Sequence, residues 1–237
     1  MIDNFGCVPP PDIEHRRRYP LEAGSISVGP MVAGMNWPAE FSRPVRRPDG
    51  TYWVDAKPPF SRIIGGHAVC LIPEGWQDVP NGWTIYNQGS TPQCVAFSSS
   101  RVQAIYNKKF QYAPAPLYAR CKQLDGWPGN GTYVRVAMDV MRREGLWLAK
   151  AKAGTGTPKL AHGILSNRWA TSPDDILDAL DARSTGRVTI LNSWGPSYPE
   201  RVYIPIETIA AMMSANGYYF EATMVTDRPG PLASKER

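Results

Sequence analysis

Three short segments of this 237-residue chain carry side chains of the types used in nucleophilic catalysis. Cys94 closes the segment NQGSTPQC, six residues after Gln88, while His67 lies in GGHAVCL and Asn192 in ILNSWG. The thiolate is the reactive form of cysteine, and a histidine within hydrogen-bond reach can take the thiol proton. An asparagine can orient that histidine, and a glutamine amide can donate to a developing oxyanion. The combination favours attack by Cys94 on a carbonyl carbon.

Each feature alone has a plainer interpretation. A cysteine at a helix start is usually an inert buried thiol, and a histidine after two glycines usually ends a strand. Asn-Ser-Trp-Gly alone could be a capping turn with a core tryptophan. Catalysis is therefore indicated only by the combination: the cysteine at a predicted helix start occurs together with the histidine, the asparagine and the glutamine on predicted strands and turns.

Together, these segments resemble the papain-like cysteine peptidases. In that family a glutamine precedes the catalytic cysteine by six residues, Ala-Phe-Ser follows closely, the histidine opens His-Ala-Val, and the asparagine lies in Asn-Ser-Trp-Gly. The resemblance implies that Cys94 attacks, His67 shuttles the proton and Asn192 orients the histidine. It also implies that Gln88 helps to stabilise the oxyanion and that Trp194 shields the Asn–His bond.

The pattern of elements agrees with an α+β fold. Apolar runs predict strands at 27–35 and 63–72, helical periodicity follows Cys94, and Ser172 with Pro173 marks another helix start. The resemblance implies two lobes with the active site in the cleft between them. We expect one peptidase domain over 26–237, with a sheet or barrel lobe from about 26–86 and 186–228 and a helical lobe from about 94–183.

Residues 1–25 are rich in proline and charge and show no hydrophobic period. We expect them to form an extension that lies over the surface, outside the core. They are too short for the helical inhibitory pro-domain of many members of the resembled family, and the sequence does not indicate whether they cross the cleft.

The order of the motifs departs from the resembled family, in which the histidine follows the cysteine. His67 precedes Cys94 while Asn192 stays late, so the segment of roughly 27–75 is expected to have moved ahead of the cysteine, with loops 73–82 and 151–159 bridging the new ends. The alternative is His162, which keeps the family order but lacks the Gly-Gly-His-Ala-Val pattern. His15, in the charged extension, is not expected to act.

Two further departures concern the cysteine segment. Thr91 replaces a cysteine of the family signature and Val95 replaces its aromatic residue. The resemblance therefore implies the loss of one disulfide and a change in one wall of the cleft. The segments GPMVAGMNW and PLYARCKQL are similar to bacterial and phage-type members.

The segment GNGTY looks like the glycine-containing strip that binds the substrate backbone in the resembled family. Gly131 is therefore the candidate for substrate binding. The alternative is a plain turn leading into a helix, with Thr132 as its cap.

Composition limits the other function classes. The net charge is +5 with scattered basic residues, so we expect no nucleic-acid partner. No run of 18 apolar residues and no apolar signal core occur, so we expect a cytoplasmic protein without a membrane span. The four cysteines lack metal-ligand spacing, so no metal or organic cofactor is predicted.

The predicted function is hydrolysis of peptide bonds in a peptide or protein substrate. Two alternatives stay open: a thiol amidase or transferase acting on cell-wall or isopeptide bonds, and a non-catalytic module that kept the fold, such as a virion component. The sequence does not indicate the oligomeric state.

Overall fold

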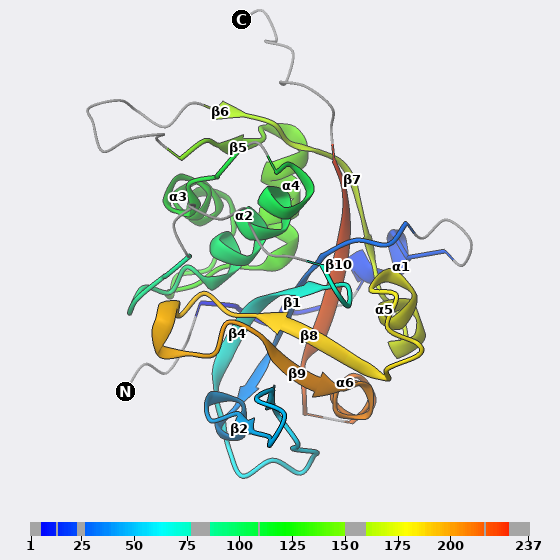
Figure 1. The fold of residues 1–237 in the computed structure, drawn as a ribbon. Coiled ribbons are helices and arrows are strands. Elements are labelled where there is room, and N and C mark those ends of the chain that lie inside the picture. Colours follow the sequence, from blue (N-terminus) through cyan, green and yellow to red (C-terminus); the bar gives the residue numbers. More distant parts are fainter. Residues whose placement is uncertain are drawn as a thin grey trace, which may run out of the picture.

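The computed structural model describes residues 6–12, 14–22, 27–76, 86–108, 110–149, 160–215 and 217–227 (Figure 1). Its main element is an eight-stranded sheet with the order β2-β3-β9-β8-β4-β1-β10-β7. All neighbouring strands are antiparallel except β3 and β9. The strands are β1 (Met31–Pro38), β2 (Val45–Arg46), β3 (Tyr52–Trp53), β4 (Ile63–Ile72), β7 (Ile164–Trp169), β8 (Arg187–Leu191), β9 (Val202–Pro205) and β10 (Phe220–Asp227).

The helices flank this sheet. α2 (Cys94–Tyr106) packs on β4 and β1, and α3 (Pro114–Leu124) and α4 (Val134–Arg143) pack beside it. In Figure 1 these three helices lie together above the sheet, next to the small sheet of β5 (Leu146–Trp147) and β6 (Leu160–Ala161). α5 (Pro173–Ala179) and α6 (Ile206–Ser214) contact each other, and the short α1 (Glu14–Arg18) contacts β7.

The two faces of the sheet belong to two separate hydrophobic cores. Side chains alternate along a strand, so neighbouring residues point to opposite faces. Ala68 and Cys70 of β4 pack into the core shared with α2–α4, whereas Val69 and Leu71 pack into the core shared with α5 and α6. β4 is therefore buried on both sides from Gly66 to Ile72, and its largely apolar sequence reflects this burial.

Several predicted elements are confirmed. β4 covers the predicted 63–72, α2 begins at Cys94, and Ser172 caps α5 in a capping box with Asp175. β1 is shifted from the predicted 27–35 to Met31–Pro38.

The position expected for the N-terminal extension is wrong in one respect. Cys7 is fully buried within the core shared with α2–α4, and Leu21 is also buried. Cys7 forms a parallel bridge with Thr132, and Pro20 forms one with Trp169. The extension is therefore partly built into the fold through contacts between residues far apart in sequence.

The connections that would bridge the relocated segment lie largely outside the described residues. Of the two predicted loops, 151–159 is not described and 73–82 is described only to Trp76. No helix among the described residues is both long enough and apolar enough to cross a membrane.

Candidate active site

Cys94 is the first residue of α2, and its sulfur lies directly against β4. The backbone N–H of Ala68 donates to Cys94 Sγ at 3.3 Å. Since Ala68 follows His67, the strand that bears the histidine is fixed beside the thiol. The cysteine also lies at the N-terminus of a 13-residue helix, where the macrodipole favours negative charge.

His67 and Asn192 come together through strand pairing. β4 and β8 are neighbours, with Cys70 opposite Leu191, and Asn192 directly follows β8. His67 Nε2 lies 2.8 Å from Asn192 Oδ1. The Ser193 backbone N–H donates to the same Oδ1 atom at 2.7 Å, which identifies that atom as the acceptor. Nε2 therefore carries the hydrogen, and in the neutral ring the lone pair is on Nδ1.

Two tryptophan rings hold the His67 ring in place. Trp194 stacks on it with ring centroids 4.8 Å apart, and Trp37 packs edge-on at 4.7 Å. Trp37 and Trp194 also contact each other at 5.4 Å. Trp194 was predicted from the Asn-Ser-Trp-Gly motif, but Trp37 was missed because its contact depends on the pairing of β1 with β4.

Gln88 is fixed by the loop that follows Asn192. The Gln88 backbone N–H donates to Ser193 O at 2.8 Å, and Ser193 Oγ donates to Gln88 Oε1 at 2.7 Å. Gln88 Nε2 in turn donates to Thr91 O at 2.9 Å. Because the amide oxygen is held by Ser193, the orientation of the whole amide is set. Ser193 stands in the motif that identified Asn192, although no role was predicted for it.

Arg101 is a further residue that sequence reasoning missed. It is almost fully buried in α2, and its Nη1 donates to the backbone carbonyl of Asn192 at 2.8 Å. The helix that carries Cys94 is thereby tied to the loop that carries Asn192.

Burial makes the site electrically neutral in this structure. Cys94 and His67 are both fully buried. Burial raises the pKa of the Cys94 thiol to about 12, against smaller opposing effects of backbone N–H groups. Burial lowers the pKa of His67 to about 4, opposed by the bond to Asn192. The uncharged thiol and imidazole are therefore the stable forms here.

A cavity of about 490 Å³ borders the site on the Gln88 side. Its lining includes Ser42, Gln88, Thr91, Trp194 and Tyr198. The ring of Trp194, which stacks on the buried His67, therefore also lines this cavity.

Gly131 lies where an extended chain runs past it. Its φ is +87°, and its neighbour Thr132 exchanges backbone hydrogen bonds with Gly6 and Val8 of the N-terminal extension. The alternative in which Thr132 caps a helix is wrong, because Tyr133 is the N-cap of α4 and no side chain caps it.

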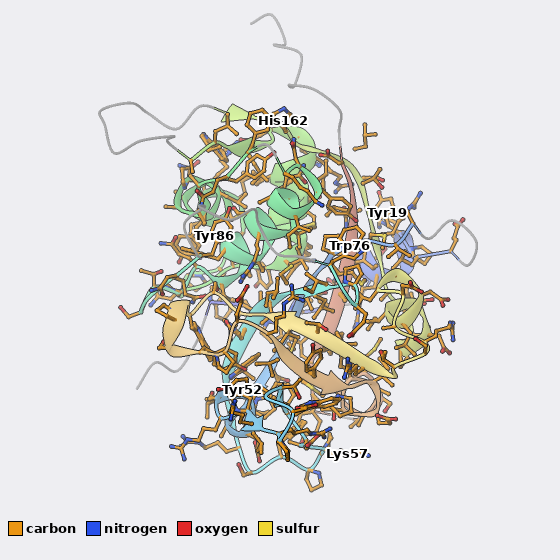
Figure 2. All side chains as sticks on the ribbon, viewed as in Figure 1. Tyr19, Tyr52, Lys57, Trp76, Tyr86 and His162 are labelled. Atoms are coloured by element: carbon orange, nitrogen blue, oxygen red, sulfur yellow. The ribbon has the colours of Figure 1, made fainter. Side chains whose placement is uncertain are left out.

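The other two histidines have separate surroundings. His162 follows β6, where its backbone carbonyl accepts from the Leu146 N–H and its ring packs against Phe110 in a tilted arrangement, with centroids 4.6 Å apart. Figure 2 shows it at the top of the view, beside β6. His15 lies in α1, and its Nε2 atom is 2.7 Å from Oε2 of Glu221 in β10. Among the described residues, no cluster of three or more histidine, cysteine and acidic side chains could hold a metal ion.

Comparison with known proteins returns structural neighbours only. No family model and no curated protein matches the chain. Xylellain, a cysteine protease from Xylella fastidiosa, is 13% identical, with 63% of this chain and 84% of that chain covered and a TM-score of 0.46. Digestive procathepsin L2 proteinase from Tenebrio molitor larval midgut is 16% identical, with 61% and 64% covered and a TM-score of 0.43.

A third neighbour comes from a structural study of the mite allergens Blo t 1 and Der p 1. It is 15% identical, with 61% of this chain and 67% of that chain covered and a TM-score of 0.41. These structural neighbours are papain-like cysteine proteases. Since every TM-score is below 0.5, the chemistry of the site has to be judged from its own geometry.

Proposed function

We propose that this protein is a cysteine peptidase that hydrolyses peptide bonds through Cys94, His67 and Asn192, with Gln88 in the oxyanion hole. The proposal includes a two-lobe arrangement in which the α2–α4 side and the sheet side meet at Cys94 and His67. It also includes a rearranged chain order, in which the histidine strand precedes the cysteine helix. Catalysis requires side chains that are adjacent in space, whatever their order in the chain.

We propose the following reaction for these groups. His67 Nδ1 takes the proton of Cys94, and the sulfur attacks the carbonyl carbon of the scissile peptide. The oxyanion accepts hydrogen bonds from Gln88 Nε2 and from the backbone N–H of Cys94. The C–N bond breaks as the leaving amine takes the proton from His67. Water, deprotonated by His67, then cleaves the thioester and releases the acid.

Asn192 acts throughout by holding Nε2–H. When His67 is protonated, the bond to Asn192 becomes charge-assisted and therefore stronger. Trp37 and Trp194 restrict the ring to one orientation while the proton moves.

The observation that carries the proposal is the 2.8 Å contact between His67 Nε2 and Asn192 Oδ1, one residue from the amide that contacts the Cys94 sulfur. A buried histidine could be satisfied by any acceptor. Here, however, its acceptor leaves the lone pair on Nδ1, which is the form a general base requires.

The test is covalent labelling of the intact protein by a peptidyl epoxide, read by mass spectrometry, alongside hydrolysis of an unfolded protein substrate and of peptidoglycan. We expect modification of Cys94 in the wild type, its loss in His67→Ala, and its retention in the matched control His162→Ala. Cleavage of peptidoglycan alone would indicate the amidase alternative. Labelling that survives His67→Ala but not His162→Ala would contradict the assignment of the base.

A further inference from the structure

A second cavity lies between α1, α4 and β7, apart from the residues proposed for catalysis. Its volume is about 360 Å³, which is within the range of pockets that hold small ligands. The buried side chains of Asn167 and Trp169, both on β7, belong to its lining. The described lining does not include Cys94, His67 or Asn192. The cavity is therefore a candidate for a separate binding site.

Arginine is the commonest charged residue around this cavity. Arg135 and Arg142 are seven residues apart, which is two helical turns, so they lie on one face of α4. Arg143 follows them in the same helix, and Arg18 lines the cavity from α1. These residues are far apart in the sequence, and the packing of α1 and α4 on β7 brings them together. The charged side chains of the described lining are Arg18, Arg135, Arg142, Arg143 and His15 on the basic side and Asp12, Glu14 and Asp139 on the acidic side. The excess of positive charge favours an anionic ligand.

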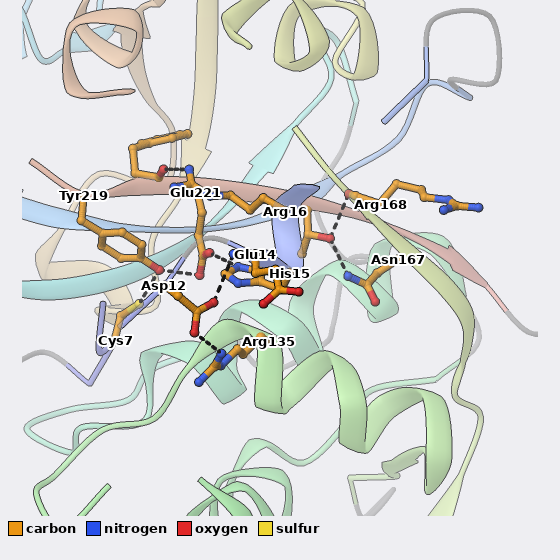
Figure 3. Close-up of polar contacts among 12 residues, drawn as sticks. Cys7, Asp12, Glu14, His15, Arg16, Arg135, Asn167, Arg168, Tyr219 and Glu221 are labelled. Carbon is orange, nitrogen blue, oxygen red and sulfur yellow. Dashed lines mark hydrogen bonds and ion pairs between the residues drawn. The ribbon is translucent and has the colours of Figure 1, made fainter. Parts of the chain in front are cut away.

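His15 is held in the cavity lining by a buried carboxylate. Its Nε2 lies 2.7 Å from Glu221 Oε2, and only 1% of the Glu221 side chain is exposed. The other carboxylate oxygen of Glu221 accepts from the Tyr219 hydroxyl (Figure 3). Because a buried carboxylate needs donors, Nε2 carries a hydrogen. Nδ1 is also buried, and it has no hydrogen-bond partner among the described residues. Whenever the ring is protonated, Nδ1 carries a second hydrogen, for which an anion in the cavity would supply the acceptor.

The ion pairs around the cavity are of a kind that a stronger anion can replace. Arg18 pairs with Glu14 on the surface, where their side chains are 62% and 70% exposed. Arg135 Nη1 lies 3.7 Å from Asp12 Oδ2, a long contact that Figure 3 shows beside His15. Exposed pairs of this type contribute little to stability. A phosphoryl group, in contrast, offers several charged oxygens that a planar guanidinium can bind through two parallel hydrogen bonds.

We propose that this cavity binds a small oxyanion ligand of the phosphate type that carries at least two negative charges. Arg18 from α1 and Arg135 and Arg143 from α4 bind its oxygens, and protonated His15 donates to it through Nδ1. The cavity explains why these basic residues are arginines, since a lysine ammonium lacks the planar pair of donors. This site is independent of the proposed function, because it uses none of the proposed catalytic residues.

The test is titration of the full-length protein with inorganic pyrophosphate by isothermal titration calorimetry, at pH 7 and at an ionic strength held constant with sodium chloride. We expect one saturable site per chain with a Kd below about 1 mM. Arg135→Gln and Arg143→Gln each remove one charge from the cavity, and each should raise the Kd at least about tenfold.

The matched control is Arg120→Gln. Arg120 lies on α3, pairs with Glu144 and is not part of the cavity lining, so this variant changes the net charge by the same amount. Its Kd should stay within about twofold of the wild-type value, because salt screens distant charges. In amide NMR spectra, pyrophosphate should shift the signals of residues 14–18 and 134–143 in wild type.

Three results would overturn the site. The first is the absence of saturable binding up to about 10 mM pyrophosphate in wild type. The second is an equal loss of affinity in Arg120→Gln and the two cavity variants, which would mean that pyrophosphate responds to the net charge alone. The third is a set of NMR shifts confined to residues outside α1, α4 and β7.

Discussion

Replacing Asn192 by alanine perturbs the proposed base without touching the nucleophile. Asn192 Oδ1 accepts from His67 Nε2 and from the Ser193 N–H, and both donors are buried. A buried donor left without a partner costs about 1–3 kcal/mol, so the free energy of unfolding should fall by about 2 kcal/mol or more.

The effect on catalysis has a separate origin. During attack His67 becomes an imidazolium, and a hydrogen bond to a charged group contributes about 1.5–3 kcal/mol. Losing this contribution in the transition state lowers kcat/KM about 10- to 150-fold. The loss should appear mainly in kcat, because Asn192 holds the base and is not proposed to bind substrate.

The assay compares kcat/KM on a fluorogenic peptide and urea unfolding for wild type, Asn192→Ala and Asn167→Ala. Asn167, in β7, is a matched control. It is 4% exposed, and its side chain donates a hydrogen bond to Thr223 Oγ1 of β10 at 3.0 Å. We expect Asn167→Ala to lose stability but keep kcat/KM. Equal activity losses in the two variants would refute the role given to Asn192.

Two further predictions concern His67 and Gln88. Burial holds the folded-state pKa of His67 at about 4, below its ordinary 6.5. Between these two pH values the unfolded chain binds more protons than the folded chain. The contribution of neutral His67 to the free energy of unfolding is therefore fully present above pH 6.5 and is lost as the pH falls through 4. This loss in the free energy of unfolding amounts to about 3 kcal/mol. Urea unfolding at pH 7 and pH 4 should therefore show a smaller difference between the two pH values in His67→Gln than in wild type. An unchanged difference would mean that other groups cause it. Ser193→Ala removes the donor that fixes Gln88 Oε1, and kcat should fall about tenfold with KM unchanged, since oxyanion donors act in the transition state; a rise in KM alone would contradict this.

Much of the site is encoded in local motifs. Cys94 was predicted at a helix start because the periodic residues begin after a turn-rich segment, and α2 begins there. The buried strand around His67 was predicted at its correct bounds because its apolar run is short and flanked by turn residues. The contact between His67 and Asn192 was expected from the resemblance of the motifs, since neither segment alone specifies its partner.

The remaining features depend on contacts between distant segments. Trp37 reaches His67 only through the register of β1 on β4, which no local pattern fixes. Cys7 was placed outside the core because its proline-rich surroundings lack a hydrophobic period. Its burial arises instead from pairing with Thr132 and Gly66. Sequence periodicity detects a face that packs along a whole element, and it cannot detect one extended segment that pairs with distant backbone groups.

The distance between His67 Nδ1 and Cys94 Sγ tests the central claim most directly. A high-resolution crystal structure of the wild-type protein would measure it. The account predicts a separation within about 4 Å, with Nε2 still bonded to Asn192. A His67 ring turned away from the sulfur, or another histidine in its place, would contradict it.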